Sequence, residues 1–325
     1  MDATELIKKQ SAAEEQKEEQ QLTHELLASL PKERGWRTTK LYLFQNFWCQ
    51  PKEIEAIMSF QKHFKAQDGD IIVATIPKSG TTWLKALAFA ISTRKRFNVK
   101  ENHPLLTSNP HDLVPFFEYN LYTDNNIPDL SHLPSPRLFG THVPLGSLPD
   151  SIRESNCRIV YVCRNPFDTF VSIWHYLVKI RPENFEPFSL EEAFDMYCRG
   201  VVGYGPYWDH MLGYYKQSLE TPHKVLFLRY EDMKKDITFD LKKLAQFLGS
   251  PFSLEEERGG VVEEIANLCS FQNLKDLEVN KEGKAISDFE NKHLFRKGEV
   301  GDWDMVKGHM VFGLSYALSH HKAAL

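Results

Sequence analysis

The sequence is poor in cysteine and has no long apolar run. Five cysteines occur in 325 residues, an odd number at wide spacings with no C-x-x-C pair, so neither a disulfide framework nor a zinc site built on paired cysteines is indicated. The longest apolar stretches, such as 71–76 and 86–91, are far shorter than the roughly 20 residues that span a bilayer. We therefore expect no membrane span, and a reducing cytosol is the compartment that this cysteine usage favours.

Positive charge is not in excess either. The chain has 39 Lys and Arg against 44 Asp and Glu, a formal net charge of −5. This balance argues against a protein that coats nucleic acid, although it leaves room for a local basic pocket that binds a small anion. With 22 Phe, 12 Tyr and 6 Trp, the chain has the side chains for a sizeable aromatic core.

Short β-branched runs alternate with segments of helical periodicity. We expect buried strands at residues 71–76, 137–142, 158–163 and 225–230. We expect helices at residues 54–64, 83–90, 167–179, 190–199, 206–219, 233–248 and 254–267. The alternation predicts an α/β fold, with a mostly parallel central sheet flanked by helices in a single domain over residues 23–303.

Two polar segments stand apart from this pattern. Residues 1–22 are rich in Glu, Gln and Lys and lack the apolar stretch of a signal peptide, so we expect a disordered polar tail. Residues 272–300 are polar with scattered apolar positions, and we expect a long loop that orders on a ligand.

The first chemical signal is the polar loop 77–82 between an expected strand and an expected helix. Such a loop presents backbone N–H groups and the positive end of the helix dipole to an anion. Gly80 permits close approach, Lys78 adds charge, and hydroxyls add donors. The loop differs from a Walker A sequence, because its lysine precedes the glycine and the first glycine is missing. Phosphate binding is therefore indicated, and an ATP- and Mg²⁺-dependent P-loop kinase is the less favoured alternative.

A second strand–turn–helix segment occupies residues 158–172. Arg164 follows the strand, at the end where α/β proteins bind ligands. Pro166 and Asp168 suit the start of a helix. Ser172 lies one helical turn beyond Asp168 and can join Arg164 on one anion.

These two motifs and a third, Arg296-Lys297-Gly298 followed by Gly301-Asp302-Trp303, resemble those of cytosolic sulfotransferases. The resemblance covers residues 25–303. It is strongest to the plant branch and, within it, to hydroxyjasmonate sulfotransferases. It implies a P-loop-like sulfotransferase fold, 3′-phosphoadenosine-5′-phosphosulfate as sulfuryl donor, no metal, a small-molecule hydroxyl acceptor, and a monomer or weak homodimer.

The resemblance also implies roles for individual residues. His142, within Gly140-Thr141-His142, is expected to be the general base, and Lys78 to neutralise the leaving phosphate. The residues expected to bind the donor are Lys78, Ser79, Gly80, Thr81, Thr82, Trp83, Arg164, Ser172, Tyr230, Phe271, Arg296, Lys297 and Gly298. Among these, Trp83 and Phe271 are expected to sandwich the adenine, and Ser79 to hold Lys78 away from the donor until an acceptor arrives.

The acceptor pocket is predicted less sharply. Candidates for its apolar wall are Phe44, Phe47, Trp48, Phe116, Phe117 and Tyr176, with core packing an equal alternative for each. A carboxylate-bearing acceptor such as hydroxyjasmonate requires a cation in the wall, for which Lys179 and Arg181 are candidates. Flavonol, brassinosteroid and desulfoglucosinolate acceptors remain alternatives.

Two positions depart from the family pattern. Relatives often carry lysine before the Thr-His pair, where this chain has Gly140, so one accessory cation is absent or supplied from elsewhere. Residues 304–325 differ from the usual family ending, and we expect an atypical C-terminal segment. An inactive homologue that only binds the nucleotide is therefore a further alternative.

Overall fold

The computed structural model describes residues 21–124, 126–186, 188–286 and 289–306. Most of the expected polar tail, residues 1–20, and most of the atypical ending, residues 307–325, lie outside the described residues. None of the helices in the described part of the chain is long and apolar enough to cross a membrane.

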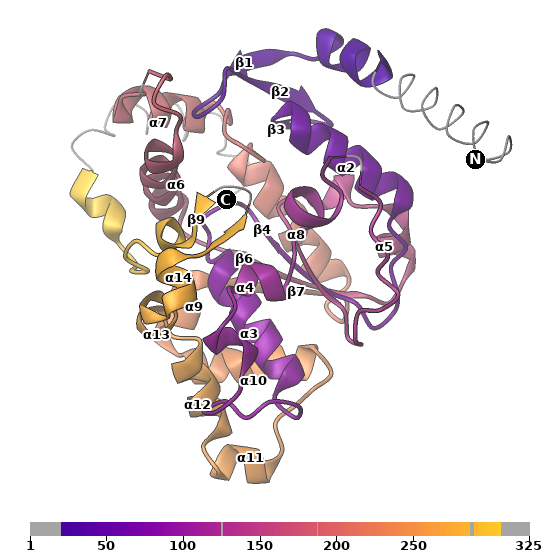
Figure 1. The fold of residues 1–325 in the computed structure, drawn as a ribbon, viewed down its shortest axis with the longest axis vertical. Helices are drawn as coiled ribbons and strands as arrows, with labels where there is room; N and C mark the ends of the chain where they lie inside the picture. Colours follow the sequence, from indigo (N-terminus) through magenta and orange to yellow (C-terminus); the bar gives the residue numbers. More distant parts are fainter. Residues whose placement is uncertain (1–20, 125, 187, 287–288, 307–325) are drawn as a thin grey trace, which may run out of the picture.

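A four-stranded parallel sheet forms the centre of the molecule (Figure 1). Its strands are β4 (Ile71–Thr75), β5 (Leu138–Thr141), β6 (Arg158–Cys163) and β7 (Val225–Arg229), in the order β5-β4-β6-β7. Ile71 of β4 pairs with Leu138 on one side and with Arg158 on the other. All four predicted strands are present, and the predicted α/β fold with a parallel central sheet is confirmed.

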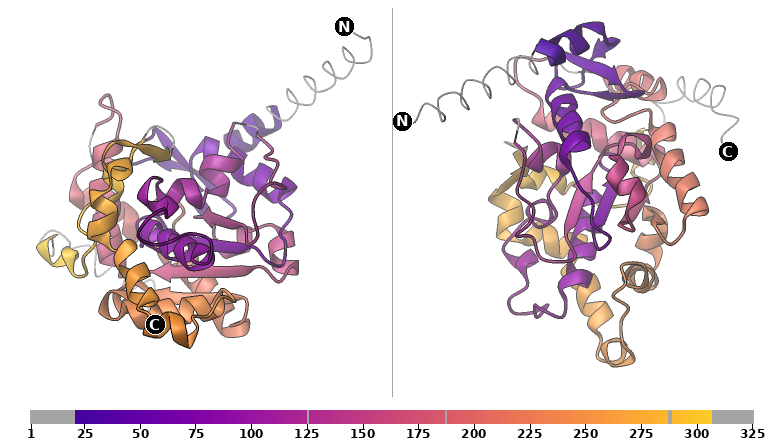
Figure 2. Two further views of the ribbon diagram at one scale, coloured as in Figure 1. Left: turned by 60° about the horizontal axis from the view of Figure 1, so that its bottom comes forward. Right: turned by 90° about the vertical axis from the view of Figure 1, so that its right-hand side faces the viewer.

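Helices cover both faces of this sheet because its side chains alternate between two cores. Val73 and Val160 face one core with residues of α3 (Thr81–Thr93), α10 (Ile237–Phe247) and α12 (Val261–Leu268). Ile72 and Tyr161 face the other core with residues of α2 (Pro51–His63), α5 (Asp150–Glu154) and α8 (Tyr207–Glu220). The two views in Figure 2 show the sheet between these helical layers.

A third core lies beside the sheet, against α6 (Pro166–Ile180) and α7 (Leu190–Cys198). It includes residues of a small antiparallel sheet that the sequence patterns did not predict. The strands of this sheet are β1 (Lys32–Arg34), β2 (Lys40–Phe44) and β3 (Phe47–Cys49), in that order. Two of them are only three residues long, which is too short for an alternating hydrophobic pattern to stand out.

Two expected helices are each divided in the structure. The expected helix at 233–248 is α10 preceded by α9 (Tyr230–Lys235), and Asp236 between them accepts from the Phe239 N–H at 3.0 Å as the N-cap of α10. The expected helix at 254–267 is α11 (Leu254–Arg258) and α12, separated at Gly260, whose φ is 78°. An N-cap side chain and a left-handed glycine each favour a helix boundary over a continuous helix.

The prediction of a long loop at residues 272–300 is wrong. This segment contains α13 (Phe271–Asp276), α14 (Glu278–Glu282), β8 (Lys284–Ile286) and β9 (Phe289–Glu290). Its order comes from buried polar groups: the Asn280 side chain donates to the Leu274 carbonyl and accepts from Asn109 Nδ2, both at 2.7 Å. The remaining elements are a helix over residues 21–29, α4 (Pro110–Leu113), 3₁₀ helices at Pro104–Leu106, Leu145–Ser147, Asn291–Leu294 and Asp302–Val306, and a π-helix at Phe117–Leu121.

Candidate active site

One cavity opens where the strands of the central sheet end. Lys78 follows β4, His142 follows β5, and Arg164 follows β6, and all three line this cavity. Parallel strands bring their carboxyl ends to one edge, which is where open α/β sheets bind ligands. The cavity therefore unites three predicted site residues that are far apart in the sequence.

The loop after β4 presents a helix N-terminus to the cavity. Gly80 is the N-cap of α3 with φ 114°, and a Cβ at this position would lie 2.9 Å from Tyr230 Cδ2. Thr81 and Thr82 form the first turn of α3 and line the cavity. Burial, followed by the nearby cations Arg164, Arg296 and Lys179, lowers the pKa of Lys78 to about 7.

The side chains of Lys78 and Ser79 form no hydrogen bond with each other. Lys78 Nζ lies 4.2 Å from the centroid of the Tyr176 ring, a cation–π contact that directs it along the cavity wall. Ser79 Oγ is buried and finds no hydrogen-bond partner among the described residues.

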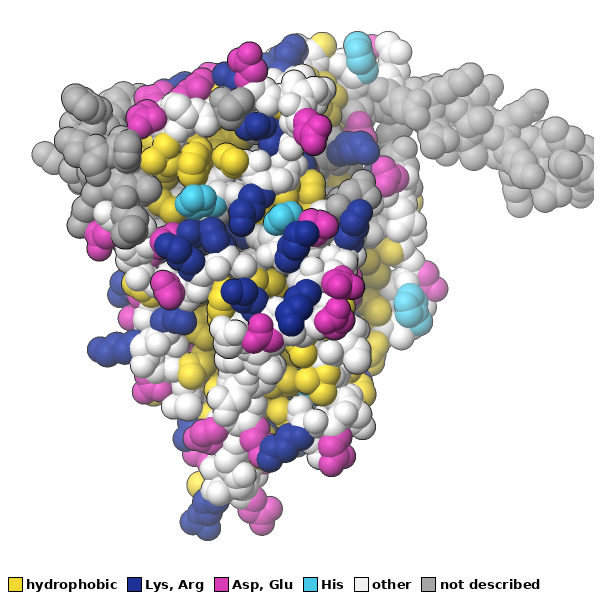
Figure 3. Space-filling model, turned by 60° about the vertical axis from the view of Figure 1, so that its left-hand side comes forward, with side chains coloured by type: hydrophobic (Ala, Val, Ile, Leu, Met, Phe, Trp, Pro, Cys, Tyr) yellow, Lys and Arg dark blue, Asp and Glu magenta, His cyan; other side chains and the backbone are white. Residues whose placement is uncertain are grey.

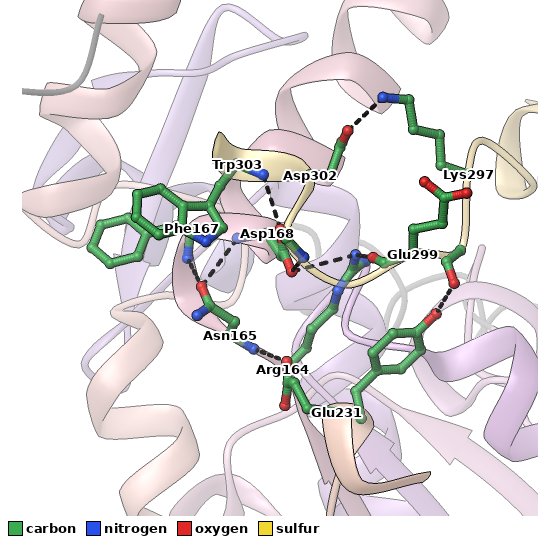
Figure 4. Close-up of polar contacts among 12 residues, drawn as sticks. Arg164, Asn165, Phe167, Asp168, Glu231, Lys297, Glu299, Asp302 and Trp303 are labelled. Carbon is green, nitrogen blue, oxygen red and sulfur yellow. Dashed lines mark hydrogen bonds and ion pairs between the residues drawn. The ribbon is translucent and has the colours of Figure 1, made fainter. Parts of the chain in front are cut away.

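Arg164 is held at the start of α6 (Figure 4). The Asn165 side chain caps this helix by accepting from the backbone N–H of Phe167 and of Asp168, and the Tyr207 hydroxyl donates to the Arg164 carbonyl. The Arg164 guanidinium lies 4.7 Å from the Tyr230 ring centroid and donates to the Glu299 carbonyl at 2.5 Å. Its Nε is buried without a partner among the described residues.

The third motif is docked onto the first turn of α6 by Asp168. Its carboxylate accepts from the backbone N–H of Gly301 at 2.9 Å and of Trp303 at 3.0 Å. Within the motif, Asp302 pairs with Lys297 (Figure 4). It also pairs with Arg296. Two segments that are far apart in sequence thus bring Arg164, Arg296 and Lys297 to one wall of the cavity.

Aromatic rings complete this end of the cavity. Trp83 and Phe271 line it, and the Tyr230 ring lies behind the wall at 5.5 Å from Trp83. Gly298, with φ 67°, lies against Phe271, and a Cβ there would lie 2.4 Å from the Phe271 ring. Of the predicted donor residues, Ser79 and Tyr230 are the two outside the lining. The Tyr230 hydroxyl donates to the carbonyl of Gly298, which lines the cavity, at 2.8 Å.

His142 has a defined tautomer. Its Nδ1 lies 2.7 Å from the Thr75 carbonyl oxygen, and because that oxygen can only accept, the proton is on Nδ1. No hydrogen bond to Nε2 from the described residues is present, which leaves its lone pair available. Burial is the main cause that lowers the pKa of His142 to about 3, so the ring is neutral at physiological pH.

Glu118 fixes the backbone around His142. Its carboxylate accepts from the His142 backbone N–H at 2.6 Å and from the Thr141 hydroxyl at 3.1 Å. Burial raises the pKa of Glu118 to about 7, although these hydrogen bonds oppose the shift. Sequence patterns did not single out this residue.

The predicted acceptor-pocket residues are divided by the structure. Phe116 and Tyr176 line the cavity. Phe47 and Phe44 pack against each other in the core next to the small sheet, and Phe117 stacks on Phe60 at 4.1 Å. Trp48 belongs to the third core. These four aromatic residues therefore pack in the hydrophobic cores, which was the alternative prediction for each of them.

Similarity to known proteins matches this geometry. Residues 68–320 match the family described as "Sulfotransferase domain". The chain belongs to the sulfotransferase family. It is 64% identical over 282 residues to cytosolic sulfotransferase 15 of Arabidopsis thaliana (86% of this chain, 79% of the relative) and 61% identical over 296 residues to cytosolic sulfotransferase 14 of the same plant (89% and 85%).

Solved structures of the family share the architecture. A candidate steroid sulphotransferase of Arabidopsis thaliana has a TM-score of 0.69 and 41% identity, and the match covers 91% of this chain and 92% of that one. Mouse sulfotransferase SULT7A1, solved in complex with PAP, has a TM-score of 0.62 and 26% identity, with 86% of this chain and 95% of that one covered.

In this sulfotransferase, the wall of the cavity contains several residues that sequence patterns missed. The lining there includes Arg37, Glu53, His111, Tyr119 and Tyr204. They come one at a time from different elements, so no contiguous motif marks them. One residue in the sequence could have indicated this part of the site. Lys85 is a single lysine among the apolar residues of α3, and the structure buries it completely beside His111. Burying a charged group is costly unless other groups compensate for it.

Cations gather locally in spite of the negative net charge. On the side of the molecule shown in Figure 3, Lys and Arg side chains form a group interspersed with acidic residues. Lys78, Arg164, Arg296 and Lys297 line one cavity, so the chain concentrates positive charge where an anionic ligand would lie. No group of three or more His, Cys, Asp or Glu side chains in the described part of the chain could hold a metal ion.

Proposed function

We propose that the chain transfers a sulfuryl group from 3′-phosphoadenosine-5′-phosphosulfate to a hydroxyl of a small carboxylic acid, with hydroxyjasmonate the specific candidate. The observation that carries this proposal is the meeting of His142, Lys78 and the cations of the third motif in one cavity. We also propose that it works in the cytosol, as the names of its Arabidopsis relatives state of them, and as a monomer or weak homodimer.

The residues present fit such a donor. Three predicted donor residues of the cavity wall have a buried polar atom without a partner among the described residues: Trp83 Nε1, Arg164 Nε and Arg296 Nε. Unsatisfied buried donors are costly unless a ligand completes them. The first turn of α3 would hold the 5′-phosphate, and Arg164, Ser172, Arg296 and Lys297 the 3′-phosphate.

The bound donor supplies the sulfuryl group and a phosphate leaving group. Lys78 stabilises the negative charge that grows on the leaving oxygen, together with N–H groups at the start of α3. His142 Nε2 takes the proton of the acceptor hydroxyl as general base. The negative charge of a bound donor raises the pKa of both groups, which favours the ammonium form of Lys78 and makes His142 a stronger base.

Arg37 supports a carboxylate-bearing acceptor. It lines the acceptor end of the cavity, where its guanidinium lies 4.7 Å from the Phe289 ring centroid. It forms no ion pair with another described residue, although its charge partly opposes the burial that raises the pKa of Glu53. Arginine suits bidentate recognition of a carboxylate. Neither Lys179 nor Arg181 lines the cavity.

Transfer of radiolabelled sulfate tests this function. The acceptors are hydroxyjasmonate, its methyl ester, a flavonol, a brassinosteroid and a desulfoglucosinolate. We expect Arg37→Gln to raise the KM for hydroxyjasmonate about 10-fold and to leave that for the uncharged ester unchanged. Arg34→Gln is the matched control, because Arg34 is exposed and pairs with Glu192.

Other results would select other functions. Preference for a neutral acceptor, with no effect of Arg37→Gln, would replace the hydroxy-acid proposal with that acceptor. Binding of adenosine 3′,5′-bisphosphate without transfer to any acceptor would indicate an inactive nucleotide-binding homologue. Transfer that requires ATP and Mg²⁺ would indicate a kinase.

A further inference from the structure

Lys85 is a buried cation that the proposed reaction leaves without a role. It lies in α3, its side chain has no solvent exposure, and it does not line the cavity. Its Nζ lies 3.2 Å from His111 Nδ1 and 3.0 Å from the centroid of the Phe116 ring. A lysine that serves only to fill space would be replaced at lower cost by an apolar side chain.

Gly140 is what makes room for this lysine. A Cβ at position 140 would lie 2.3 Å from Lys85 Cε and 2.4 Å from Nζ, distances that no side-chain atom tolerates. Relatives often carry a lysine at position 140, and this chain has none there. Its place beside the β5 strand end is taken by the end of another lysine, which enters from α3.

Lys85 is connected to the cavity by a directed chain of hydrogen bonds. A lysine nitrogen carries N–H donors in both of its protonation states and an ammonium has no acceptor, so we assign donation from Nζ to His111 Nδ1. The His111 proton is then on Nε2, which lies 2.9 Å from Thr82 Oγ1 and donates to it. The hydroxyl proton of Thr82 is thereby left for an acceptor in the cavity, which Thr82 and His111 both line.

We infer that Lys85 is a positioning residue for the 5′-phosphate of the donor, acting through His111 and Thr82. The inference rests on the proposed function, since it requires that phosphate at the start of α3. Lys85 orients the Thr82 hydroxyl toward the phosphate and places a positive charge behind it. The chain polarises further as negative charge grows on the leaving oxygen, so its effect is largest in the transition state.

The charge of Lys85 depends on its surroundings. Burial lowers its pKa well below the usual value, and Glu118 and Asp112 oppose this shift. His111 is neutral, because burial and the neighbouring Lys85 both lower its pKa. A polyanionic donor in the cavity adds negative charge nearby and favours the protonated lysine.

Two nucleotides that differ only in the 5′-phosphate test the inference by calorimetry. We expect Lys85→Met to bind adenosine 3′,5′-bisphosphate about 10-fold more weakly than the unchanged protein, and to bind adenosine 3′-monophosphate equally well. Lys234→Met is the matched control, since Lys234 is exposed and lies 6.0 Å from the Trp83 ring centroid. Equal weakening of both nucleotides, or of neither, would overturn the inference. Failure of the unchanged protein to bind the bisphosphate would refute the proposed function instead.

His111→Phe tests the route, and covers the case in which Lys85→Met fails to fold. Phenylalanine keeps the stacking on Phe116, whose ring centroid is 5.1 Å from that of His111, but ends the hydrogen-bond chain. We expect the same selective loss for the bisphosphate, no further loss in the double variant, and a larger fall in kcat than rise in the donor KM. A double variant whose losses multiply would show that Lys85 acts by another route.

Discussion

The proposed donor end and the proposed acceptor end of the cavity are built in different ways. At the donor end, residues 77–83 and 296–298 are contiguous motifs, and Arg164 lies at a strand end. The acceptor end is lined by single residues, among them Arg37, which precedes β2, and Glu53 of α2. Backbone geometry thus shapes the donor end, whereas scattered side chains shape the acceptor end, which leaves acceptor choice open to change without loss of donor binding.

The two ends also differ in charge. The donor end gathers cations: burial of Lys78, followed by repulsion from nearby cations, lowers the pKa of Lys78 to about 7. At the other end the neutral His142 lines the cavity and the neutral His210 lies behind it, where the His210 Nε2–H donates to the His142 carbonyl at 2.8 Å. One end is prepared for a polyanion, and the other for a neutral hydroxyl that must lose a proton.

The largest effect is expected where the two ends meet. His142→Gln removes the proposed general base and is expected to lower kcat by about 10²–10⁴-fold, while calorimetric affinity for adenosine 3′,5′-bisphosphate is expected to be unchanged. His132→Gln, at an exposed position, is the control and should retain full activity. Normal turnover by His142→Gln would refute the assigned base.

A substitution at Arg164 tests whether donor binding and acceptor binding are independent. Arg164→Lys keeps a charge but loses the planar fork for phosphate, so the affinity for the bisphosphate is expected to fall about 10- to 100-fold with an unchanged acceptor KM. Arg229→Lys is the matched control, because Arg229 ends the neighbouring strand β7 and is exposed. An increase in acceptor KM of the same size would show that the two ends are not independent.

This contrast also explains what sequence could predict. Strand β6 and the helices at 167–179 and 190–199 were predicted nearly to the residue, because long periodic segments and buried β-branched runs give strong signals. The donor motifs were predictable for the same local reason: each is contiguous, and parallel strands determine where it lies. Of the predicted donor residues, only Ser79 and Tyr230 lie outside the lining.

The missed features depend on contacts between distant segments. Tyr119 lines the cavity because Phe117–Leu121 forms a π-helix beside β5, which no propensity predicts. The ordered segment after Phe271 depends on the buried Asn109–Asn280 hydrogen bond across 171 residues. The division of the aromatic candidates between core and cavity likewise required the packing of three separate cores.

Low pH is expected to lower the free energy of unfolding through two buried histidines near the proposed acceptor end. Burial lowers the pKa of His210 to about 4 and of His142 to about 3, whereas unfolded histidine titrates near about 6.5. Between these values the unfolded chain binds protons at these two histidines that the folded chain does not, so both make stability fall as the pH falls below about 6.5. Glu118, whose pKa burial raises to about 7, contributes in the opposite direction. Each group contributes up to about 1.4 kcal/mol per pH unit.

Urea unfolding at several pH values between 7 and 5 measures this dependence. His210→Gln should reduce the slope of unfolding free energy against pH, and His132→Gln should not. A slope unchanged by His210→Gln would mean that His210 is not the neutral group that this geometry requires.

The smallest expected effect distinguishes an aromatic residue that lines the cavity from one that packs in the core. The Phe116 ring centroid lies 4.7 Å from that of His142, so Phe116→Leu is expected to raise the acceptor KM about 3- to 10-fold. Trp48→Leu should leave that KM unchanged and lower the free energy of unfolding by about 1–3 kcal/mol. If instead Trp48→Leu raised the KM at full stability, the wall would extend into the third core, and the acceptor would reach beyond the cavity that the donor end shares.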